Sequence, residues 1–327
     1  MMAHEPVDPK SQNGRGRQSG QGEASGAQPD SIADAAALEV RPARPEDRDA
    51  VLAFCAHTWD DGDYIQYVWD GWLNDDRGVL LVGLLDGQPV AINHVAMISE
   101  DEAWLEGMRV DPAFRRSGFG RILVSRSLVA ARDREAAVAR LFTSSHNLAS
   151  QGMIARFGFV RVAEMVRYRG PALASDDAVK PVALAHPGPD DFERLWEWLE
   201  HSNLTPLTGG LEYNGWQAQA LTEPRLRGYL AAGQVRTFEE WGTIQALAIR
   251  VARPRDSGRP PALEVRYMDG QADGIGRLAL ALRAEAANER CERVELWLPD
   301  LLILHDAMDG AGYEGDDETM LVFARDL

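Results

Sequence analysis

The stretch MRVDPAFRRSGFGRILVSRSL, residues 108–128, joins an apolar, strand-like run to a run whose apolar residues have helical spacing. Its centre, RRSGFGR at residues 115–121, contains two glycines and three arginines. Glycines at the junction of a strand and a helix let the backbone approach a ligand closely and expose several N–H groups. The helix N-terminus adds partial positive charge, and arginines can form charge-assisted bonds with phosphate. The turn therefore predicts a pyrophosphate site.

Two familiar phosphate-binding motifs are absent from this turn. The pattern GxxxxGK[ST] does not occur, and GxGxxG would need glycine at position 123, which is Leu123. A surface turn with incidental arginines is the simpler alternative. The turn alone does not decide between the two interpretations.

The segments around the turn mix strands and helices without regular alternation, which favours an α+β fold over a doubly wound sheet. The apolar spacing predicts each element. Expected strands are residues 38–43, a hairpin over 79–99 across Asp86-Gly87, 102–110, 139–145 and 160–170. Expected helices are 44–59, part of 58–78, the run after the turn to about 131, and 147–159. Each domain should hold a mixed, mostly antiparallel sheet flanked by helices.

The same order of elements begins again in the second half of the chain. Expected strands there are 182–187, 234–240, 244–252, 262–268, 293–299 and 319–327, and expected helices are 190–202, 274–289 and 301–314. Repetition at half-chain length predicts two domains of one fold, at residues 37–170 and 181–327. Residues 171–180 are expected to link them. Residues 1–36 contain no aromatic residue and are expected to be a disordered tail without a signal peptide.

The composition is that of a soluble globular protein, with 45% hydrophobic and 26% charged residues in 327. No run of about 18 apolar residues occurs, so no membrane span and a cytoplasmic location are expected. Cys55 and Cys291 lie far apart, which favours buried thiols over a disulfide. The net charge is −17, and residues 171–327 carry 15 basic against 27 acidic groups. That excess argues against a nucleic-acid partner, which would need a basic face. The histidines fall at no metal-ligand spacing, so no metal is expected.

The turn and its surroundings resemble the Gcn5-related N-acetyltransferase (GNAT) superfamily, of the type with tandem domains. Arg115-x-x-Gly118-x-Gly120 matches the Q/R-x-x-G-x-G/A signature, and NLASQGMIARFGF at 147–159 resembles the family's N…GF helix. The resemblance implies acetyl-CoA, or another acyl-CoA, as the acyl donor, in a gap between the fourth and fifth strands. It assigns the donor to Met108, Arg109, Val110, Arg115, Arg116, Ser117, Gly118, Phe119, Gly120, Arg121 and Asn147. A monomer or homodimer acting on a small-molecule amine is expected.

Acyl transfer to an amine needs a base, because an alkylammonium has a pKa of about 10. Glu106 is the best candidate, since it lies two residues before Met108 and should share a strand face with it. A solvent-facing carboxylate or a salt-bridge partner is the alternative for Glu106. The chain departs from the family at the usual general acid, because Ile154 stands where relatives often have tyrosine.

Aromatic and acidic residues gather between the first helix and the second strand, where the family covers its acceptor. Trp59, Asp63 and Tyr64 are the candidate substrate contacts, since acids attract a cationic amine and aromatic rings can stack on it. An aromatic core face with a solvated acidic turn is the alternative. The segments DGDYI, VWDGWL and EGMRV also resemble histidine N-acetyltransferase-like proteins, which suggests a free amino acid such as histidine.

The second half repeats the glycine signature as Gln271-x-x-Gly274-x-Gly276. Asp269 and Asp273 stand where positive charge would be needed, and like charges beside a pyrophosphate repel it. We therefore expect the C-terminal domain to be a degenerate copy. Two alternatives stay open: a non-catalytic acyl-CoA-binding or sensing protein, and a tandem enzyme resembling mycothiol synthase with its chemistry in the C-terminal domain.

Overall fold

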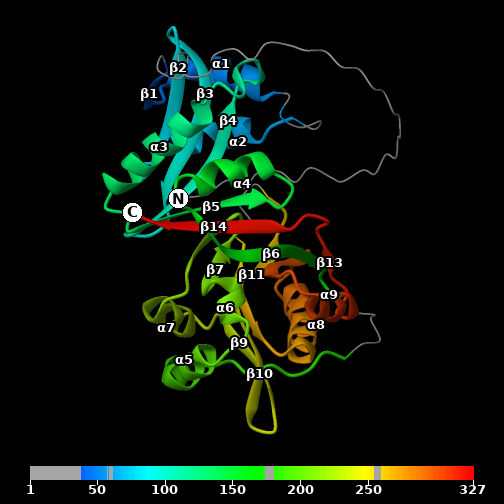
Figure 1. Ribbon diagram of the computed structural model, residues 1–327. Helices are drawn as coiled ribbons and strands as arrows, with labels where there is room; N and C mark the ends of the chain where they lie inside the picture. Colours follow the sequence, from blue (N-terminus) through cyan, green and yellow to red (C-terminus); the bar gives the residue numbers. More distant parts are fainter. Residues whose placement is uncertain (1–37, 57, 59–61, 174–179, 254–258) are drawn as a thin grey trace, which may run out of the picture. The chain divides into compact units, whose positions relative to one another are not determined.

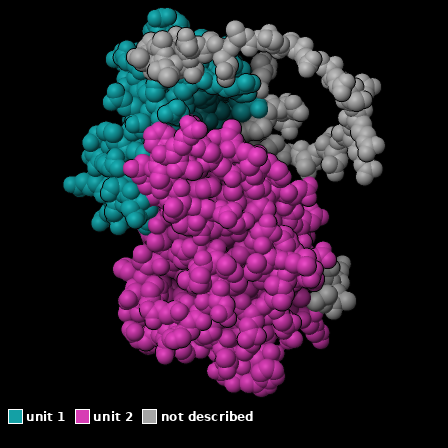
Figure 2. Space-filling model, viewed as in Figure 1, with its two compact units in different colours: residues 1–139, 326–327 teal, residues 140–325 magenta. Residues whose placement is uncertain are grey.

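The structure is a computed structural model that describes residues 38–56, 58, 62–173, 180–253 and 259–327 (Figure 1). They form two compact units, Met1–Ala139 with Asp326–Leu327, and Arg140–Arg325 (Figure 2). The sequence predicted a linker at 171–180 instead, so the division into domains at that point stays a prediction. The predicted tail and residues 174–179 of that linker lie outside the described residues.

The first unit contains an antiparallel sheet with the strand order β1-β2-β3-β4. Its strands are β1 (Glu39–Pro42), β2 (Val79–Leu85), β3 (Gln88–Met97) and β4 (Glu102–Val110), and its helices are α1 (Arg48–Cys55), α2 (Ile65–Leu73) and α3 (Phe119–Arg132). Asp86 and Gly87 join β2 to β3 with φ angles of 49° and 78°. Two successive positive φ values are typical of the type I′ turn that an Asp-Gly pair predicts.

Helices cover both faces of this sheet. Val51 and Cys55 of α1 and Val68 of α2 pack with Val82 of β2 and Ile92 of β3 in one buried cluster. A second cluster joins α3 to the sheet through Phe119, Leu123, Val90, Ala91 and Leu38. The helical spacing of apolar residues thus directs each helix onto the sheet, as the sequence predicted.

The second unit contains a longer sheet with the strand order β5-β14-β6-β12-β11-β10-β9, and a separate hairpin of β7 and β8. Its strands are β5 (Val138–Ser144), β6 (Val160–Pro171), β7 (Leu211–Asn214), β8 (Gln217–Ala220), β9 (Val235–Glu240), β10 (Thr243–Ala252), β11 (Ala262–Gly270), β12 (Arg293–Pro299), β13 (Glu314–Gly315) and β14 (Met320–Asp326). Its helices are α4 (Leu148–Ala155), α5 (Phe192–Glu200), α6 (Thr205–Thr208), α7 (Glu223–Ala231), α8 (Ala272–Asn288) and α9 (Leu302–Gly310). β11 and β12 run parallel, whereas β10 with β11 and β12 with β6 run antiparallel.

Two strands that are distant in sequence, β6 and β14, lie side by side in this sheet (Figure 1). Leu321 of β14 pairs with Glu164 of β6, and Tyr168 of β6 pairs with Leu296 of β12. β14 therefore separates β5 from β6, although β5 and β6 are close in sequence.

Helices also cover both faces of the second sheet. Leu278 and Leu282 of α8 pack with Leu263, Val294 and Leu296 on one face. α5 and α7 pack against the other face, through Phe192, Leu195, Leu199, Leu226 and Leu230. The first unit thus has an antiparallel sheet and the second a mixed, mostly antiparallel one, and helices flank both, which confirms the predicted α+β class. No helix among the described residues is long and apolar enough to cross a membrane.

The sequence reasoning missed or misplaced parts of the second unit. Residues 182–187 were expected to form a strand, but they contain only an isolated bridge between Ala185 and Thr237. The hairpin of β7 and β8 and the helices α6 and α7 were not expected, because residues 203–231 show no sustained apolar period.

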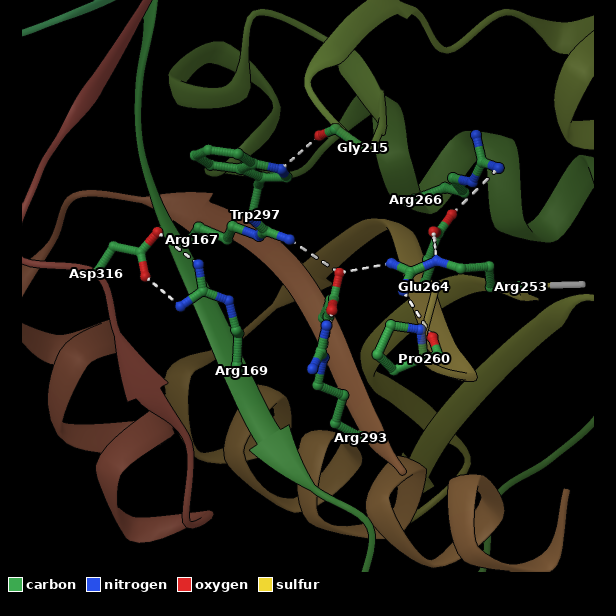
Figure 3. A network of polar contacts seen from close by, with 11 residues as sticks. Arg167, Arg169, Gly215, Arg253, Pro260, Glu264, Arg266, Arg293, Trp297 and Asp316 are labelled. Atoms are coloured by element: carbon green, nitrogen blue, oxygen red, sulfur yellow. Dashed lines mark hydrogen bonds and ion pairs between the residues drawn. The ribbon is translucent and has the colours of Figure 1, made fainter. Parts of the chain in front are cut away.

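A network of buried charges crosses the sheet of the second unit (Figure 3). Glu295 of β12 accepts hydrogen bonds from Arg167 of β6 at 2.9 Å and from Arg253 at 2.7 Å. Arg293 also pairs with Glu295, and Arg253 pairs with Glu264 at 2.8 Å. Burial opposes ionisation, but the nearby guanidinium groups outweigh it and lower the pKa of Glu295 to about 2.

Candidate active site

β4 contains a β-bulge just before its end. Ile92 of β3 pairs with Arg109 of β4, and His94 pairs with Glu106, so two residues of β4 face one residue of β3. Gly107 lies in the bulge with a φ of 69°, a left-handed conformation that favours glycine.

The bulge changes what the side chains of β4 face. A Cβ atom on Gly107 would lie 2.4 Å from Cη2 of Trp72, so the missing side chain leaves room for the indole ring. The expectation that Glu106 and Met108 share a face assumed strict alternation along the strand. The bulge interrupts that alternation between the two residues.

Glu106 belongs to a chain of three ionisable groups. His94 Nδ1 lies 3.0 Å from Oε1 of Glu106, and His94 Nε2 lies 3.2 Å from Oδ2 of Asp75. The His94 side chain is 2% exposed, whereas those of Asp75 and Glu106 are each 18% exposed. Burial alone would lower the pKa of His94, but hydrogen bonds to Asp75 and Glu106 outweigh it and raise the pKa above its ordinary value.

Asp75 is held in place from two sides. Its Oδ1 accepts a hydrogen bond from the backbone N–H of Arg77 at 3.0 Å, and its Oδ2 lies against His94. Burial opposes ionisation, but the hydrogen bonds with His94 and with the N–H groups of Arg77 and Gly78 lower the pKa of Asp75. A Cβ on Gly78 would lie 2.2 Å from Oδ2 of Asp75, so glycine permits this close approach.

Trp72 of α2 covers the histidine. Its ring stacks on that of His94, with centroids 4.7 Å apart and an interplanar angle of 14°. Tyr64 meets the edge of Trp72 at 6.1 Å. Burial raises the pKa of Tyr64 to about 12, so its hydroxyl stays protonated at neutral pH.

Arg109 is directed at the segment before α2. Its Nε donates to Oδ2 of Asp63 at 2.7 Å, and its guanidinium carbon lies 5.1 Å from the ring centre of Tyr64. The Asp63 side chain is 2% exposed. The charge of Asp63 is thus already balanced by Arg109, and this pair fixes the start of α2 against the end of β4.

The predicted pyrophosphate turn begins α3. Gly118 is the N-cap with a φ of 87°, and no side chain caps the helix. The N–H groups of Arg121 and Ile122 donate to the carbonyl of Gly118. The first N–H groups of a helix have no acceptor within the helix. In the part of the chain that the structure describes, the N–H groups of Phe119 and Gly120 are therefore available to bind an external anion.

Three arginines lie in the turn and in the first turn of α3. Arg115, Arg116 and Arg121 are exposed, and within the described residues none of them forms an ion pair with a carboxylate. Arg116 has a φ of 68°, a conformation rarely adopted by a residue with a side chain. Phe119 is 1% exposed and packs into the core, so only its backbone could bind a ligand.

Two residues expected from the family's N…GF helix lie in the second unit. The side chain of Asn147 caps α4 and accepts a hydrogen bond from the N–H of Ser150 at 3.1 Å. Ile154, at the place where relatives often have tyrosine, is completely buried. Both side chains therefore have structural roles in α4.

The second glycine signature has a different structural role. α8 begins at Ala272, directly after β11, so Gly274 and Gly276 lie inside the helix. A Cβ on Gly274 would lie 2.6 Å from the carbonyl oxygen of Gln245, and one on Gly276 would lie 3.1 Å from that of Ala307. These glycines allow α8 to pack closely, whereas Gly118 lies in a turn outside its helix.

The structure brings together Glu106, Arg109, Asp63 and Tyr64 in the first unit, as the contacts above describe. Trp59, the remaining predicted substrate contact, lies outside the described residues. Sequence reasoning missed His94, Asp75 and Trp72. The available signal was a polar pair, Asn93-His94, within the apolar strand β3.

Comparison with known proteins gives three likenesses. Residues 47–159 match the acetyltransferase (GNAT) family. The histidine N-acetyltransferase of Oreochromis niloticus is 30% identical over 109 residues, which cover 32% of this chain and 32% of that protein. The match therefore spans about a third of the length of the curated relative. A GCN5-related N-acetyltransferase structure from Sphaerobacter thermophilus aligns with a TM-score of 0.56 at 16% identity, covering 92% of this chain and 97% of that one.

The structural likeness establishes the fold across both units. The family match includes β2, β3, β4 and α3, and therefore Glu106 and the turn at Gly118. Residues 47–159 of this chain are thus similar to the acetyltransferase (GNAT) family.

Proposed function

We propose that this protein is an acetyl-CoA-dependent N-acetyltransferase that acetylates the amine of a small molecule, with a free amino acid such as histidine as its acceptor. The observation that carries the proposal is the Glu106 carboxylate, which is held against His94 on a bulged strand that leads directly to the turn at Gly118. The family match of residues 47–159 supports acetyl transfer. The likeness to a histidine N-acetyltransferase supports an amino acid as the first acceptor to test.

The residues of the turn suit the pyrophosphate of CoA. The N–H groups of Phe119 and Gly120 point from a positively polarised helix end, and the exposed Arg115, Arg116 and Arg121 supply charge-assisted hydrogen bonds. Acetyl-CoA would supply the acetyl group as a thioester. The chain's own residues bind the donor, orient the acceptor and accept its proton.

Glu106 has the chemistry that the transfer requires. An α-ammonium group has a pKa of about 8 and must lose a proton before its nitrogen can attack the thioester carbonyl. The Glu106 carboxylate accepts that proton, and the freed lone pair of the nitrogen then attacks the thioester carbonyl to form the C–N bond. The C–S bond breaks, and the leaving thiolate of CoA takes up the second proton that the nitrogen loses. A thiol has a pKa of about 8.5, so thiolate leaves readily without a tyrosine at position 154.

Turnover on a panel of amines tests the proposal. The full chain is mixed with acetyl-CoA and each of the free amino acids, including histidine, or a small alkylamine, and release of the CoA thiol is measured. We expect release with at least one amine. The result that contradicts the proposal is one in which calorimetry shows that acetyl-CoA binds but no amine of the panel causes release of the thiol. That result would favour a non-catalytic acyl-CoA-binding protein.

The variant Glu106→Gln tests the assigned base. General bases contribute about 10²- to 10⁴-fold, so we expect a loss of turnover in that range with unchanged affinity for acetyl-CoA. Glu39→Gln, the same substitution at an exposed strand position of the same unit, is the matched control and should leave turnover unchanged. Equal activity of the two variants would show that Glu106 is not the base.

A further inference from the structure

We propose that His94 and Asp75 are positioning residues for Glu106: a doubly protonated imidazole bridges the two carboxylates and holds Glu106 in the orientation that proton abstraction needs. This inference rests on the proposed function. It adds residues that lie behind the base and do not themselves touch the reacting atoms.

The first argument is the geometry of the imidazole ring. Each nitrogen of His94 faces a carboxylate oxygen, Glu106 at 3.0 Å and Asp75 at 3.2 Å. A neutral imidazole donates from one nitrogen only, so two carboxylate acceptors can both be satisfied only by the imidazolium. Each carboxylate accepts from the ring, and the three groups together carry a single net negative charge.

The second argument is that the chain fixes this ring from several sides. Trp72 stacks on one face, where its π system favours a cation. The indole fits because Gly107 has no side chain, and Asp75 fits because Gly78 has none. Two positions without a Cβ atom therefore serve one arrangement, in which His94 cannot turn away from Glu106.

The third argument concerns cost and charge. Burying a charged triad stabilises a fold less than apolar residues of similar size would, and His94 is almost completely buried. Within the described part of the chain, the charged groups that face His94 are Asp75, from the segment after α2, and Glu106 of β4. Tyr64 stays neutral beside Trp72, and Arg109 pairs with Asp63. A buried cation that lowers stability at this place is explained if it orients the carboxylate of Glu106.

The bridge has one consequence for Glu106. Oε1 is bound to the ring, so the plane of the carboxylate is set by β3 and not by rotation in solvent. Removing the bridge should therefore reduce turnover, because the carboxylate is then free to turn away from the acceptor amine.

The imidazole can be observed directly, without turnover. The full chain is labelled with ¹⁵N-histidine, and the signal that disappears in His94→Phe identifies the residue. We expect both ring nitrogens to stay protonated above pH 6.5, the usual midpoint of histidine. Glu106→Gln and Asp75→Asn should each move the titration of His94 to lower pH. An ordinary midpoint that neither variant moves would overturn the bridge.

Kinetics then test the positioning role, with the amine that the panel shows to be best. His94→Phe keeps a ring for Trp72 but has no N–H group, and Asp75→Asn is the less disruptive second variant. We expect kcat to fall about 10- to 100-fold in His94→Phe and less in Asp75→Asn, with unchanged affinity for acetyl-CoA.

A control on the opposite face of β3 separates positioning from folding. Asn93 donates to the hydroxyl of Ser127 at 2.7 Å, and Ser127→Ala breaks this buried bond without touching Glu106. It should leave kcat unchanged. If wild type is active and both His94→Phe and Asp75→Asn keep its kcat, the positioning role is wrong and the proposed function stands. Absence of turnover in wild type would overturn both the proposed function and the positioning role. The titration of His94 would still show whether the imidazole bridges the two carboxylates.

Discussion

The substitution Gly107→Ala should destabilise the first unit through two separate effects. A left-handed backbone costs a residue with a Cβ about 1–2 kcal/mol, and Gly107 has a φ of 69°. The new methyl group would also lie 2.4 Å from Trp72, and overpacking of this kind costs about 1–3 kcal/mol. Together the free energy of unfolding should fall by about 2–5 kcal/mol.

Gly87→Ala is the matched control for this measurement. Gly87 has a φ of 78° in the β2–β3 turn, but a Cβ there would meet nothing within 4 Å. Guanidinium unfolding of the two variants, followed by circular dichroism, should therefore differ by the overpacking contribution of about 1–3 kcal/mol.

A second change tests whether Trp72 causes the difference. Trp72→Leu removes the ring atoms that a Cβ at Gly107 would meet. The loss of unfolding free energy that Trp72→Leu causes should therefore be smaller by at least about 1 kcal/mol in the Gly107→Ala variant than in wild type. Equal stabilities of Gly107→Ala and Gly87→Ala, or no coupling with Trp72, would refute the reasoning.

Four further predictions concern stability and reactivity. The pKa of Glu295 is lowered from 4.5 to about 2, so its ionised form adds about 3 kcal/mol to the free energy of unfolding above pH 4.5. Acid unfolding should show that this contribution is lost as the pH falls toward 2. Glu295→Gln should cost about 3–5 kcal/mol in denaturant unfolding, because buried guanidinium groups lose their partner. Gly274→Ala should cost about 1–3 kcal/mol by meeting the carbonyl of Gln245, with unchanged affinity for acetyl-CoA in calorimetry. Burial raises the pKa of Cys55 to about 12, so mass spectrometry should find it unmodified by iodoacetamide at pH 8 while the protein is folded.

Much of the fold could be predicted because it depends on local patterns. The Asp86-Gly87 pair predicts its turn through the φ values it allows, and apolar spacing predicts α3 and α8. The turn at Gly118 is predictable for the same reason, since a glycine between a strand and a helix has few other roles.

The parts that sequence reasoning missed depend on partners distant in sequence. Asp75 and His94 are 19 residues apart, and neither shows from its own neighbours that it will face the other. The bulge at Gly107 reflects the size of Trp72, which lies on another element. The two glycine signatures have the same spacing, and only the start of the helix relative to Gly274 distinguishes them.

The position of β14 between β5 and β6 bears on how this protein can be divided in the laboratory. A fragment that ends near residue 170 contains β5 and β6 but not the strand that joins them. Both would expose unpaired backbone N–H and C=O groups, which readily recruit strands from other molecules. Supplying residues 320–326 as a separate peptide, or fusing them to the fragment through a flexible linker, offers a way to complete the sheet. During synthesis, too, β14 is made about 150 residues after β6, so β5 and β6 can pair with it only once the chain is almost complete.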